Sequence, residues 1–172
     1  MKKLSIITPC YNEEISVFEC HERLSNVMKL QLPNYEYEHI FADNSSSDNT
    51  VKNLKRIASE DQRVKIIVNS RNVGPFRNMW NAMKSASGDA IVPLLPADLQ
   101  DPPEVIPEFV RRWEEGDLIV YGIRSNRQES WVMRFLRNIY YRVIHRFAEA
   151  VIPRNSGEFL LADKRVIMSV LE

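Results

Sequence analysis

A chain of 172 residues is long enough to bury a substantial core, and its 44% hydrophobic and 27% charged residues are ordinary for a soluble globular protein. Its 23 basic and 23 acidic side chains balance, so bulk charge gives no argument for a nucleic acid as partner. The cysteines Cys10 and Cys20 have no metal-ligand spacing, and no apolar run approaches the ~20 residues of a membrane-spanning helix. Reduced thiols and a cytoplasmic location are therefore expected.

Strand-like apolar runs alternate with helical patterns along the chain. The first half predicts, in order, a strand at 4–8, a helix after the turn at 11–14 to about residue 30, a strand at 37–42, a helix at 49–59, a strand at 64–68 and a helix at 76–85. The second half predicts a strand at 90–95, a helix at 104–115, a strand at 117–121, a helix at 131–150, a strand at 159–162 and a further helix start.

This alternation indicates the α/β class, with a mostly parallel, Rossmann-like sheet covered by helices on both faces. Ligands of such sheets bind beyond the carboxyl ends of the strands. Four polar clusters, at 11–14, 43–48, 69–74 and 96–101, each follow a predicted strand. We therefore expect them to converge on one rim of the sheet, where the functional site would lie.

Each cluster taken alone has a purely structural alternative. Asp43 with the serines at 45–47 could cap the next helix, and Asp98 with Asp101 could cap the helix after Pro102. Gly74 could simply supply a positive φ in a plain loop. The three histidines show no ligand spacing, and the three tryptophans are expected in the core or at element boundaries. The order and spacing of the clusters together favour a functional reading.

That combination resembles the family 2 glycosyltransferases, which have the GT-A fold. The matching segments are 6–14, 42–48, 70–74, 97–104, 121–124 and 157–164. The run Asp-Leu-Gln-Asp-Pro-Pro-Glu at 98–104 is most similar to the branch that moves a sugar from a nucleotide onto a polyprenyl (dolichyl or undecaprenyl) phosphate, as in the synthesis of cell envelope polysaccharides. The resemblance implies one catalytic-type domain over 1–172.

The resemblance also implies where a UDP- or GDP-linked sugar would bind. The nucleotide-binding residues it assigns are Pro9, Tyr11, Asn12, Glu13, Asp43, Arg71, Asn72, Gly74 and Ala97. The family usually has two adjacent acidic residues at the end of the second strand. Ala42 stands at the first of these positions here, so only Asp43 remains.

A divalent metal, Mg²⁺ or Mn²⁺, is the cofactor that the resemblance implies, because the leaving pyrophosphate needs charge neutralisation. Two aspartates separated by one residue hold this metal in the family, with a nearby Gln. Asp98 and Gln100 match the second aspartate and the Gln. Pro96 stands at the first aspartate position and offers no side-chain ligand, which weakens the expected site unless Asp101 or another group substitutes.

Inverting members of the family use a single displacement without a protein nucleophile. The resemblance implies catalytic roles for Asp98, Glu158 and Arg124, with Arg124 and Arg127 as candidates for binding the acceptor phosphate. The structural alternative for the two arginines is a solvated loop. Glu158 stands where the family has Asp in a Gly-Asp-Phe-Arg element, and Leu160 stands at the Arg of that element.

The predicted helix at 131–150 carries four arginines beside its apolar stripe. It could lie on an anionic membrane surface at the cytoplasmic face, or it could be a core-packing helix with a charged solvent face. Relatives in this branch continue further, so a truncated chain, a shortened gene product and a soluble relative all stay open. A sheet edge left open by the shorter chain would favour a homodimer.

Two functions of different kinds remain after this reading. One is an active glycosyltransferase, favoured by Asp43, Asp98 and Gln100. The other is a degenerate relative that binds a nucleotide or a partner without catalysis, favoured by Pro96, Ala42 and Leu160. A dinucleotide-binding oxidoreductase is disfavoured because no Gly-x-Gly-x-x-Gly follows the first strand.

Overall fold

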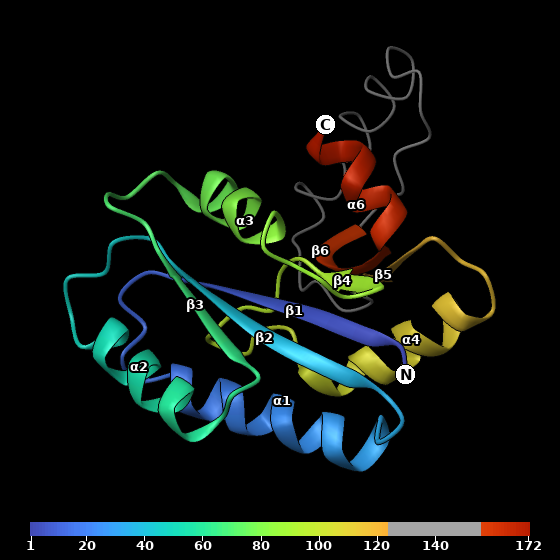
Figure 1. Cartoon of the computed structure of the whole chain (residues 1–172), viewed down its shortest axis with the longest axis horizontal. Coiled ribbons are helices and arrows are strands. Elements are labelled where there is room, and N and C mark those ends of the chain that lie inside the picture. The colour runs from blue at the N-terminus through green and yellow to red at the C-terminus, as the bar shows by residue number, and fades with distance from the viewer. Residues whose placement is uncertain (124–155) are drawn as a thin grey trace, which may run out of the picture. The chain divides into compact units, whose positions relative to one another are not determined.

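The computed structural model describes residues 1–123 and 156–172, with the backbone alone at 123 and 156–158. The first half contains β1 (Lys3–Cys10), α1 (Val17–Gln31), β2 (Glu36–Asp43), α2 (Thr50–Glu60), β3 (Val64–Val68) and α3 (Pro75–Met83). The second half contains β4 (Ala90–Val92), the 3-10 turn η1 (Pro103–Val105), α4 (Ile106–Glu114), β5 (Ile119–Ile123), β6 (Ser156–Asp163) and α6 (Lys164–Leu171). Figure 1 shows these elements.

The strands form one six-stranded sheet in the order β3-β2-β1-β4-β6-β5. β1 pairs in parallel with β2 and with β4, and β2 pairs in parallel with β3. β6 runs antiparallel to β4. The expectation of an α/β fold with a mostly parallel sheet is confirmed. The chain divides into two compact units, 1–120 with 159–172, and 121–158. The single domain expected over 1–172 stays a prediction.

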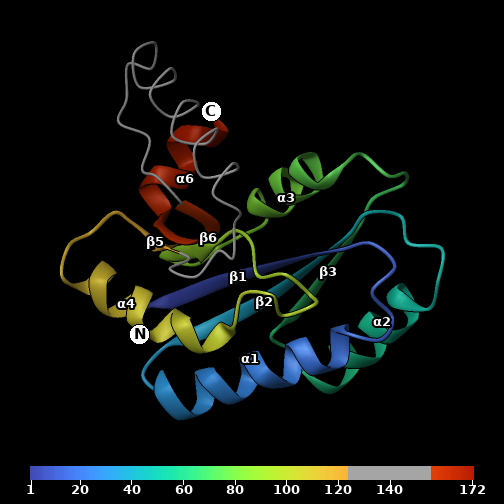
Figure 2. The ribbon, with the colours of Figure 1, turned by 180° about the vertical axis from the view of Figure 1, so that it is seen from behind.

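Helices cover both faces of the sheet (Figures 1 and 2): α1, α2 and α4 lie on one face, and α3 and α6 on the other. The side chains of β1 alternate between the two layers, as a strand buried on both faces requires. Leu4 and Ile6 pack in the layer with α1 and α4, whereas Ile7 packs in the layer with α3 and α6. The continuous apolar run of the sequence follows from burial on both sides.

Two predicted elements differ from the observed ones because of prolines. The strand expected at 90–95 ends at Val92, where Pro93 lacks the N–H that a ladder needs. The helix expected at 104–115 begins as a 3-10 turn, and α4 proper starts at Ile106 with Pro107 in its first turn. A glycine often follows the last turn of a helix, but α3 already ends at Met83, so Gly88 is not its terminating residue.

Gly88 has a packing role instead, because a Cβ at this position would lie 2.6 Å from the backbone nitrogen of Ser5. The predicted helix at 131–150 lies outside the described residues. In the part of the chain that is described, no helix has the length and apolar character needed to cross a bilayer. Cys10 and Cys20 are free and buried, and burial raises the pKa of Cys20 to about 12.

Candidate functional site

The carboxyl ends of β1 and β2 are joined by hydrogen bonds between the loops that follow them. Asn12 adopts a positive φ of 57°, and its backbone N–H donates to the Ser46 hydroxyl over 2.9 Å. Its side-chain carbonyl accepts from the backbone N–H of Ser47, also over 2.9 Å. The N–H of Glu13 donates to the Thr50 hydroxyl over 2.8 Å. The clusters at 11–14 and 43–48 therefore form one wall.

Asp43 ends β2 and is fully buried. Its Oδ2 accepts from the backbone N–H of Ser46 over 3.0 Å. Its Oδ1 is buried and, within the described part of the chain, has no hydrogen-bond partner. Buried carboxylate oxygens are normally satisfied, so an orphan oxygen at the rim marks a place where a ligand's N–H or O–H can bind. α2 begins at Thr50, so the reading of Asp43 as its cap is wrong.

Asn44 connects this wall to the loop after β3. The residue is buried, its Nδ2 donates to Asn72 Oδ1, and its Oδ1 accepts from the backbone N–H of Val73, both over 2.9 Å. Asn72 Oδ1 also accepts from the N–H of Gly74, which has a φ of +84°. The positive φ expected at Gly74 is therefore observed. The predicted residues Asn72 and Gly74 belong to the same network as Asp43.

The loop after β4 approaches the same rim. The N–H of Leu95 donates to the carbonyl of Ile7 over 2.8 Å, and Ala97 is buried in a cluster with Cys10 and Phe41. Asp98 and Gln100 are both exposed, and Asp98 Oδ1 accepts from the Gln100 N–H over 3.2 Å. The N-cap residues of η1 and α4 are Pro102 and Val105, and Asp98 binds the N–H of Gln100 instead, so the reading of Asp98 as a helix cap is wrong.

Arg23 anchors the far end of this loop to α1 through Glu104, with nitrogen–oxygen distances of 2.8 to 3.2 Å. The remaining predicted nucleotide residues lie around the rim with different exposure. Tyr11 and Arg71 are exposed, while Pro9 and Glu13 are half-buried. Arg124 and Arg127 lie outside the described residues, as does the side chain of Glu158.

Asn78 supports this rim and was not among the residues predicted from the sequence. Asn78 is buried on α3, donates to the Ala42 carbonyl over 2.7 Å and accepts from Asn69 over 2.7 Å. A buried Asn in the apolar stripe of a predicted helix is the pattern that could have revealed it.

His39 of β2, which is buried, and His21 of α1, which is half-buried, form a chain of contacts with Thr8 and Asp61. Thr8 Oγ1 lies 2.9 Å from His39 Nε2, the two Nδ1 atoms lie 3.1 Å apart, and His21 Nε2 lies 3.3 Å from an Asp61 oxygen. Burial lowers the pKa of His39 well below its ordinary value, and the nearby His21 lowers it further. These three contacts can all be hydrogen bonds when both imidazole rings are neutral. Thr8 then donates to His39, His39 donates to His21, and His21 donates to Asp61.

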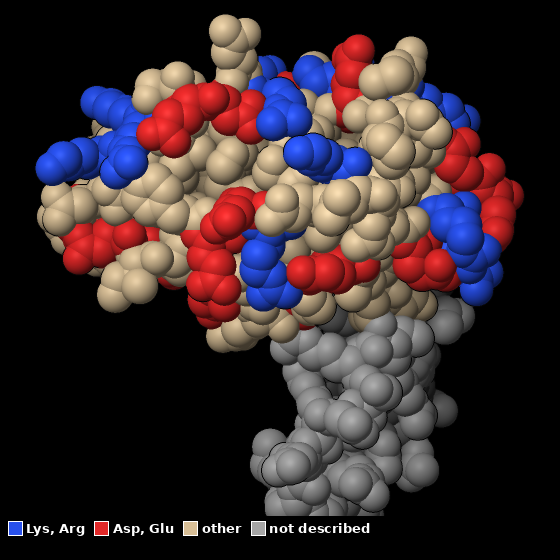
Figure 3. Space-filling model, turned by 90° about the horizontal axis from the view of Figure 1, so that it is seen from below, with Lys and Arg blue, Asp and Glu red and all other residues tan. Residues whose placement is uncertain are grey.

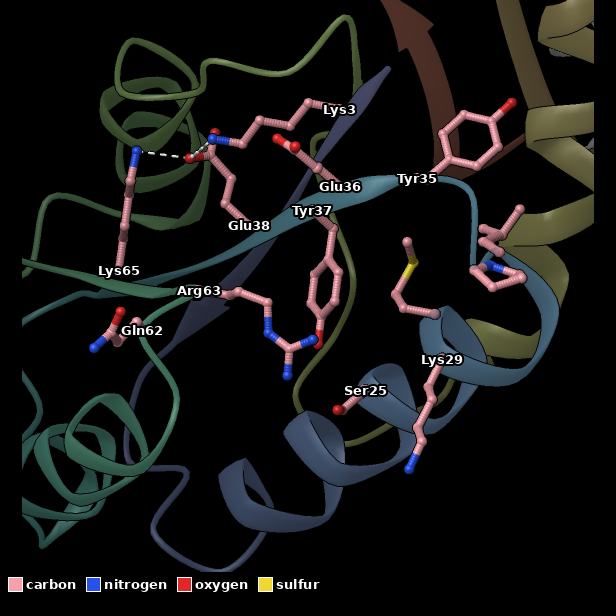
Figure 4. A pocket seen from close by; sticks show the side chains of 13 residues that line it. Lys3, Ser25, Lys29, Tyr35, Glu36, Tyr37, Glu38, Gln62, Arg63 and Lys65 are labelled. Carbon is pink, nitrogen blue, oxygen red and sulfur yellow. Dashed lines mark hydrogen bonds and ion pairs between the residues drawn. The ribbon is translucent and has the colours of Figure 1, made fainter. Parts of the chain in front are cut away.

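A pocket of about 610 Å³ lies at the opposite, amino-terminal edge of the sheet. Figure 4 shows Lys3 and Lys65 converging there on Glu38, whose Oε2 lies 3.0 and 2.6 Å from the two ammonium groups. Arg63 lies over the ring of Tyr37, whose hydroxyl is buried without a hydrogen bond to any described residue. Most cations of this pocket already have a carboxylate partner within the protein, so it lacks the open charges of the rim.

Comparison with known proteins identifies the family of the chain. Residues 5–170 match the family model of glycosyl transferase family 2. An uncharacterized glycosyltransferase of Synechocystis sp. is 40% identical over 98% of this chain and 52% of its own length. The undecaprenyl-phosphate 4-deoxy-4-formamido-L-arabinose transferase of Proteus mirabilis is 38% identical over 92% of this chain and 47% of its own.

The fold is also similar to that of a mannosyltransferase from Pyrobaculum calidifontis, solved in complex with GDP-Man and Mn²⁺. Its TM-score is 0.67 at 17% identity, over 97% of this chain and 46% of that one. The chain thus spans about half the length of the curated relatives that it matches. Because the family model matches nearly the whole chain, the chain belongs to glycosyl transferase family 2.

Proposed function

We propose that this chain is a single catalytic-type domain that transfers a sugar from a UDP- or GDP-linked donor to a polyprenyl phosphate. The observation that carries the proposal is the buried Asp43 Oδ1 at the rim, an acceptor without a partner among the described residues. A nucleobase N–H or a ribose hydroxyl would satisfy it. A site built to hydrogen-bond such a group discriminates strongly against a ligand that lacks it.

We place the donor site between the two walls beside Asp43. We assign Pro9, Tyr11, Asn12 and Glu13 to one side, and Arg71, Asn72 and Gly74 to the other. The hydrogen bonds of Asn44 hold the two walls together before any ligand arrives. Such preorganisation lowers the entropy lost on binding. The exposed guanidinium of Arg71 is available for a diphosphate.

The residues of the 96–101 loop fit a metal that arrives with the donor. Carboxylate and amide oxygens suit Mg²⁺ or Mn²⁺, which are often held by one or two carboxylates together with substrate phosphates. Asp98 and Gln100 supply one of each, and Pro96 supplies none. The described residues contain no group of three or more His, Cys, Asp or Glu that could hold a metal alone. When bound, the cation would neutralise charge on the leaving diphosphate.

The chemistry we propose is one inverting displacement. An oxygen of the acceptor phosphate forms a bond to the anomeric carbon of the sugar, and the bond from that carbon to the diphosphate oxygen breaks. The nucleoside diphosphate leaves with the electron pair. Because the acceptor oxygen is anionic near neutral pH, a strong general base is not required. Arg124 and Arg127 would hold the acceptor phosphate, and Glu158 would orient it.

Calorimetric titration of UDP and GDP, with their sugars, tests the donor proposal. We expect one of the two nucleotides to bind, and to bind more tightly with Mn²⁺ than without it. The absence of binding to either nucleotide, with or without Mn²⁺, would overturn the proposal. Transfer of a labelled sugar to undecaprenyl phosphate then tests the acceptor.

A second candidate function is a degenerate glycosyltransferase that binds a nucleotide without catalysis. The observation in its favour is Pro96, which removes a carboxylate from the loop that carries Asp98. A Pro96→Asp variant separates the two functions. If it gains metal-dependent binding and transfer that the unaltered chain lacks, the degenerate function is correct.

A further inference from the structure

We infer that the outer face of α3, formed by Phe76, Arg77, Trp80 and Lys84, is a contact surface for an anionic lipid bilayer. This inference rests on the proposed function in one respect, since a lipid-linked acceptor lies at such a surface. Its evidence, however, is the chemistry of α3 itself. The arginine-rich segment at 131–150 takes no part in it.

The outer face of α3 is aromatic. The helix buries Asn78, Ala82 and Met83 toward the sheet. On the other side Phe76 is 70% exposed and Trp80 is 37% exposed. The spacing of four residues places these two rings on the same side of the helix. Trp80 is therefore an exception to the expectation that the tryptophans pack in the core or at element boundaries, whereas the buried Trp113 agrees with it.

The same segment is cationic. Residues 69–88 contain Arg71, Arg77 and Lys84 but no Asp or Glu. Arg77 and Lys84 are exposed, and neither makes an ion pair within the part of the chain that the structure describes. Aromatic rings beside unpaired cations are typical of helices that lie in the interface of anionic membranes.

The opposite face of the molecule has a different character. Figure 3, which views the side of α1 and α2, shows acidic and basic side chains interspersed. On α4, Arg111 and Arg112 pair with Glu108 and Glu115, and on α2 Arg56 pairs with Glu60. Such paired charges have no net attraction for an anionic surface. The charge pattern thus selects the α3 face over the α1 and α2 face.

α6 lies on the same side of the sheet as α3 and extends this surface. Its Ile167 packs in one cluster with Met83. Met168 and Val170 are about half exposed, and Lys164 is exposed. The surface also adjoins the rim, because α3 starts directly after Gly74, whose N–H binds Asn72. A bilayer against α3 would bring the rim close to a lipid phosphate.

Vesicle sedimentation tests the inference without nucleotide, metal or polyprenyl phosphate. We expect the 172-residue chain to bind vesicles of equal parts phosphatidylcholine and phosphatidylglycerol, and to bind phosphatidylcholine alone much more weakly. Binding should fall as salt is added. Because the acceptor and the donor are absent, failure of this assay and failure of sugar transfer are separate results.

Two variants and two matched controls locate the surface. Arg77→Gln with Lys84→Gln should lower partitioning about 25-fold, at about fivefold for each cation. Phe76→Ser with Trp80→Ser should lower it about tenfold or more. The control for the cations is Lys52→Gln with Lys55→Gln, at exposed positions of α2. The control for the aromatic rings is Ile15→Ser, at an apolar residue that is 91% exposed. Both controls should bind vesicles as the unaltered chain does.

Three outcomes would overturn the inference. The first is no binding of the unaltered chain to the anionic vesicles. The second is equal loss in the α3 variants and in the controls. The third concerns the Phe76 and Trp80 variant: its oligomeric state, measured by light scattering, changes while its vesicle binding does not. That result would mean that this face is an interface between copies of the chain. If that variant does not fold, the Arg77 and Lys84 variant decides alone.

Discussion

Two buried carboxylates at opposite ends of β2 have opposite surroundings. Glu38, near the amino end, is fully engaged: its Oε1 accepts from Ser5 Oγ at 2.6 Å and from the Ser87 N–H at 2.7 Å, and its Oε2 meets Lys3 and Lys65. Asp43, at the carboxyl end, has one hydrogen bond from Ser46, and its other oxygen has none from any residue described.

The difference separates a structural carboxylate from a candidate binding carboxylate. Glu38 ties the starts of three strands to the turn before β4, and its charge is compensated inside the protein. Asp43 retains a buried acceptor oxygen that no described residue satisfies. Burial alone would not distinguish the two, since both side chains are almost fully inaccessible. What distinguishes them is whether their oxygens are satisfied.

The largest expected effect is the loss of stability in Glu38→Gln. Removing the charge leaves two ammonium groups beside a neutral amide, and breaking a buried ion pair is strongly destabilising. Lys3 and Lys65 are partly exposed and can turn toward water, so we expect a loss of about 3 kcal/mol, at the low end for such pairs. Urea unfolding measures it. Asp43→Asn on the same strand is the control, and an equal loss there would contradict the distinction.

Acid unfolding should have two stages. Burial lowers the pKa of His39, so the unfolded chain binds more protons and stability is lost as the pH falls below about 6.5. Burial tends to raise the pKa of Glu38, but hydrogen bonds from Lys65, Ser5, Ser87 and Lys3 outweigh it and bring the value to about 2. Stability held by this carboxylate is therefore present above pH 4.5 and is lost as the pH falls from 4.5 toward 2.

The unfolding free energy measured against pH tests these two stages. Glu38→Gln should retain the loss near pH 6 and show a smaller loss between pH 4.5 and 2, because other carboxylates with lowered pKa values, such as Asp61 and Glu114, still contribute there. A lower stage of unchanged size in Glu38→Gln would assign that stage to the other carboxylates alone.

Asp43→Ala should affect binding more than folding. It removes one hydrogen bond and one incompletely satisfied buried carboxylate, so stability should change by less than about 1 kcal/mol. Affinity for the nucleotide should fall about 10- to 100-fold, because the charged acceptor for its N–H or O–H is lost. Calorimetry and thermal unfolding measure the two effects. Unchanged affinity would remove Asp43 from the proposed site.

The smallest effect is expected for Arg23→Ala. The Arg23–Glu104 pair is partly exposed and should contribute about 0.5 kcal/mol to stability. Because this ion pair lies at the end of the 96–104 loop, the affinity for the nucleotide in the presence of Mn²⁺ is a more informative measurement than the stability. A loss of affinity well beyond the loss of stability would show that Asp98 needs this anchor.

Much of the fold could be predicted from hydrophobic pattern. The strands at 4–8, 37–42 and 64–68 lie within observed strands, and the helices of the first half end within two residues of the predicted ends. The short β4 and the 3-10 start before α4 differ because Pro93, Pro103 and Pro107 impose backbone limits that a count of apolar residues does not contain.

The sequence by itself determined the family, the alternation of strands and helices, and the convergence of four polar loops on one rim. The family follows from the resemblance of its motifs, whereas the other two properties depend on local periodicity and on the direction of parallel strands, and all of these can be read along the chain. Only the tertiary structure decided that the charge of Glu38 is compensated while one oxygen of Asp43 has no partner among the described residues, that Asn44 and Asn78 support the rim, and that Trp80 faces outward. These features depend on contacts between residues far apart in sequence. The role of a buried polar side chain is determined by the partners that it meets in the fold, and not by its residue type.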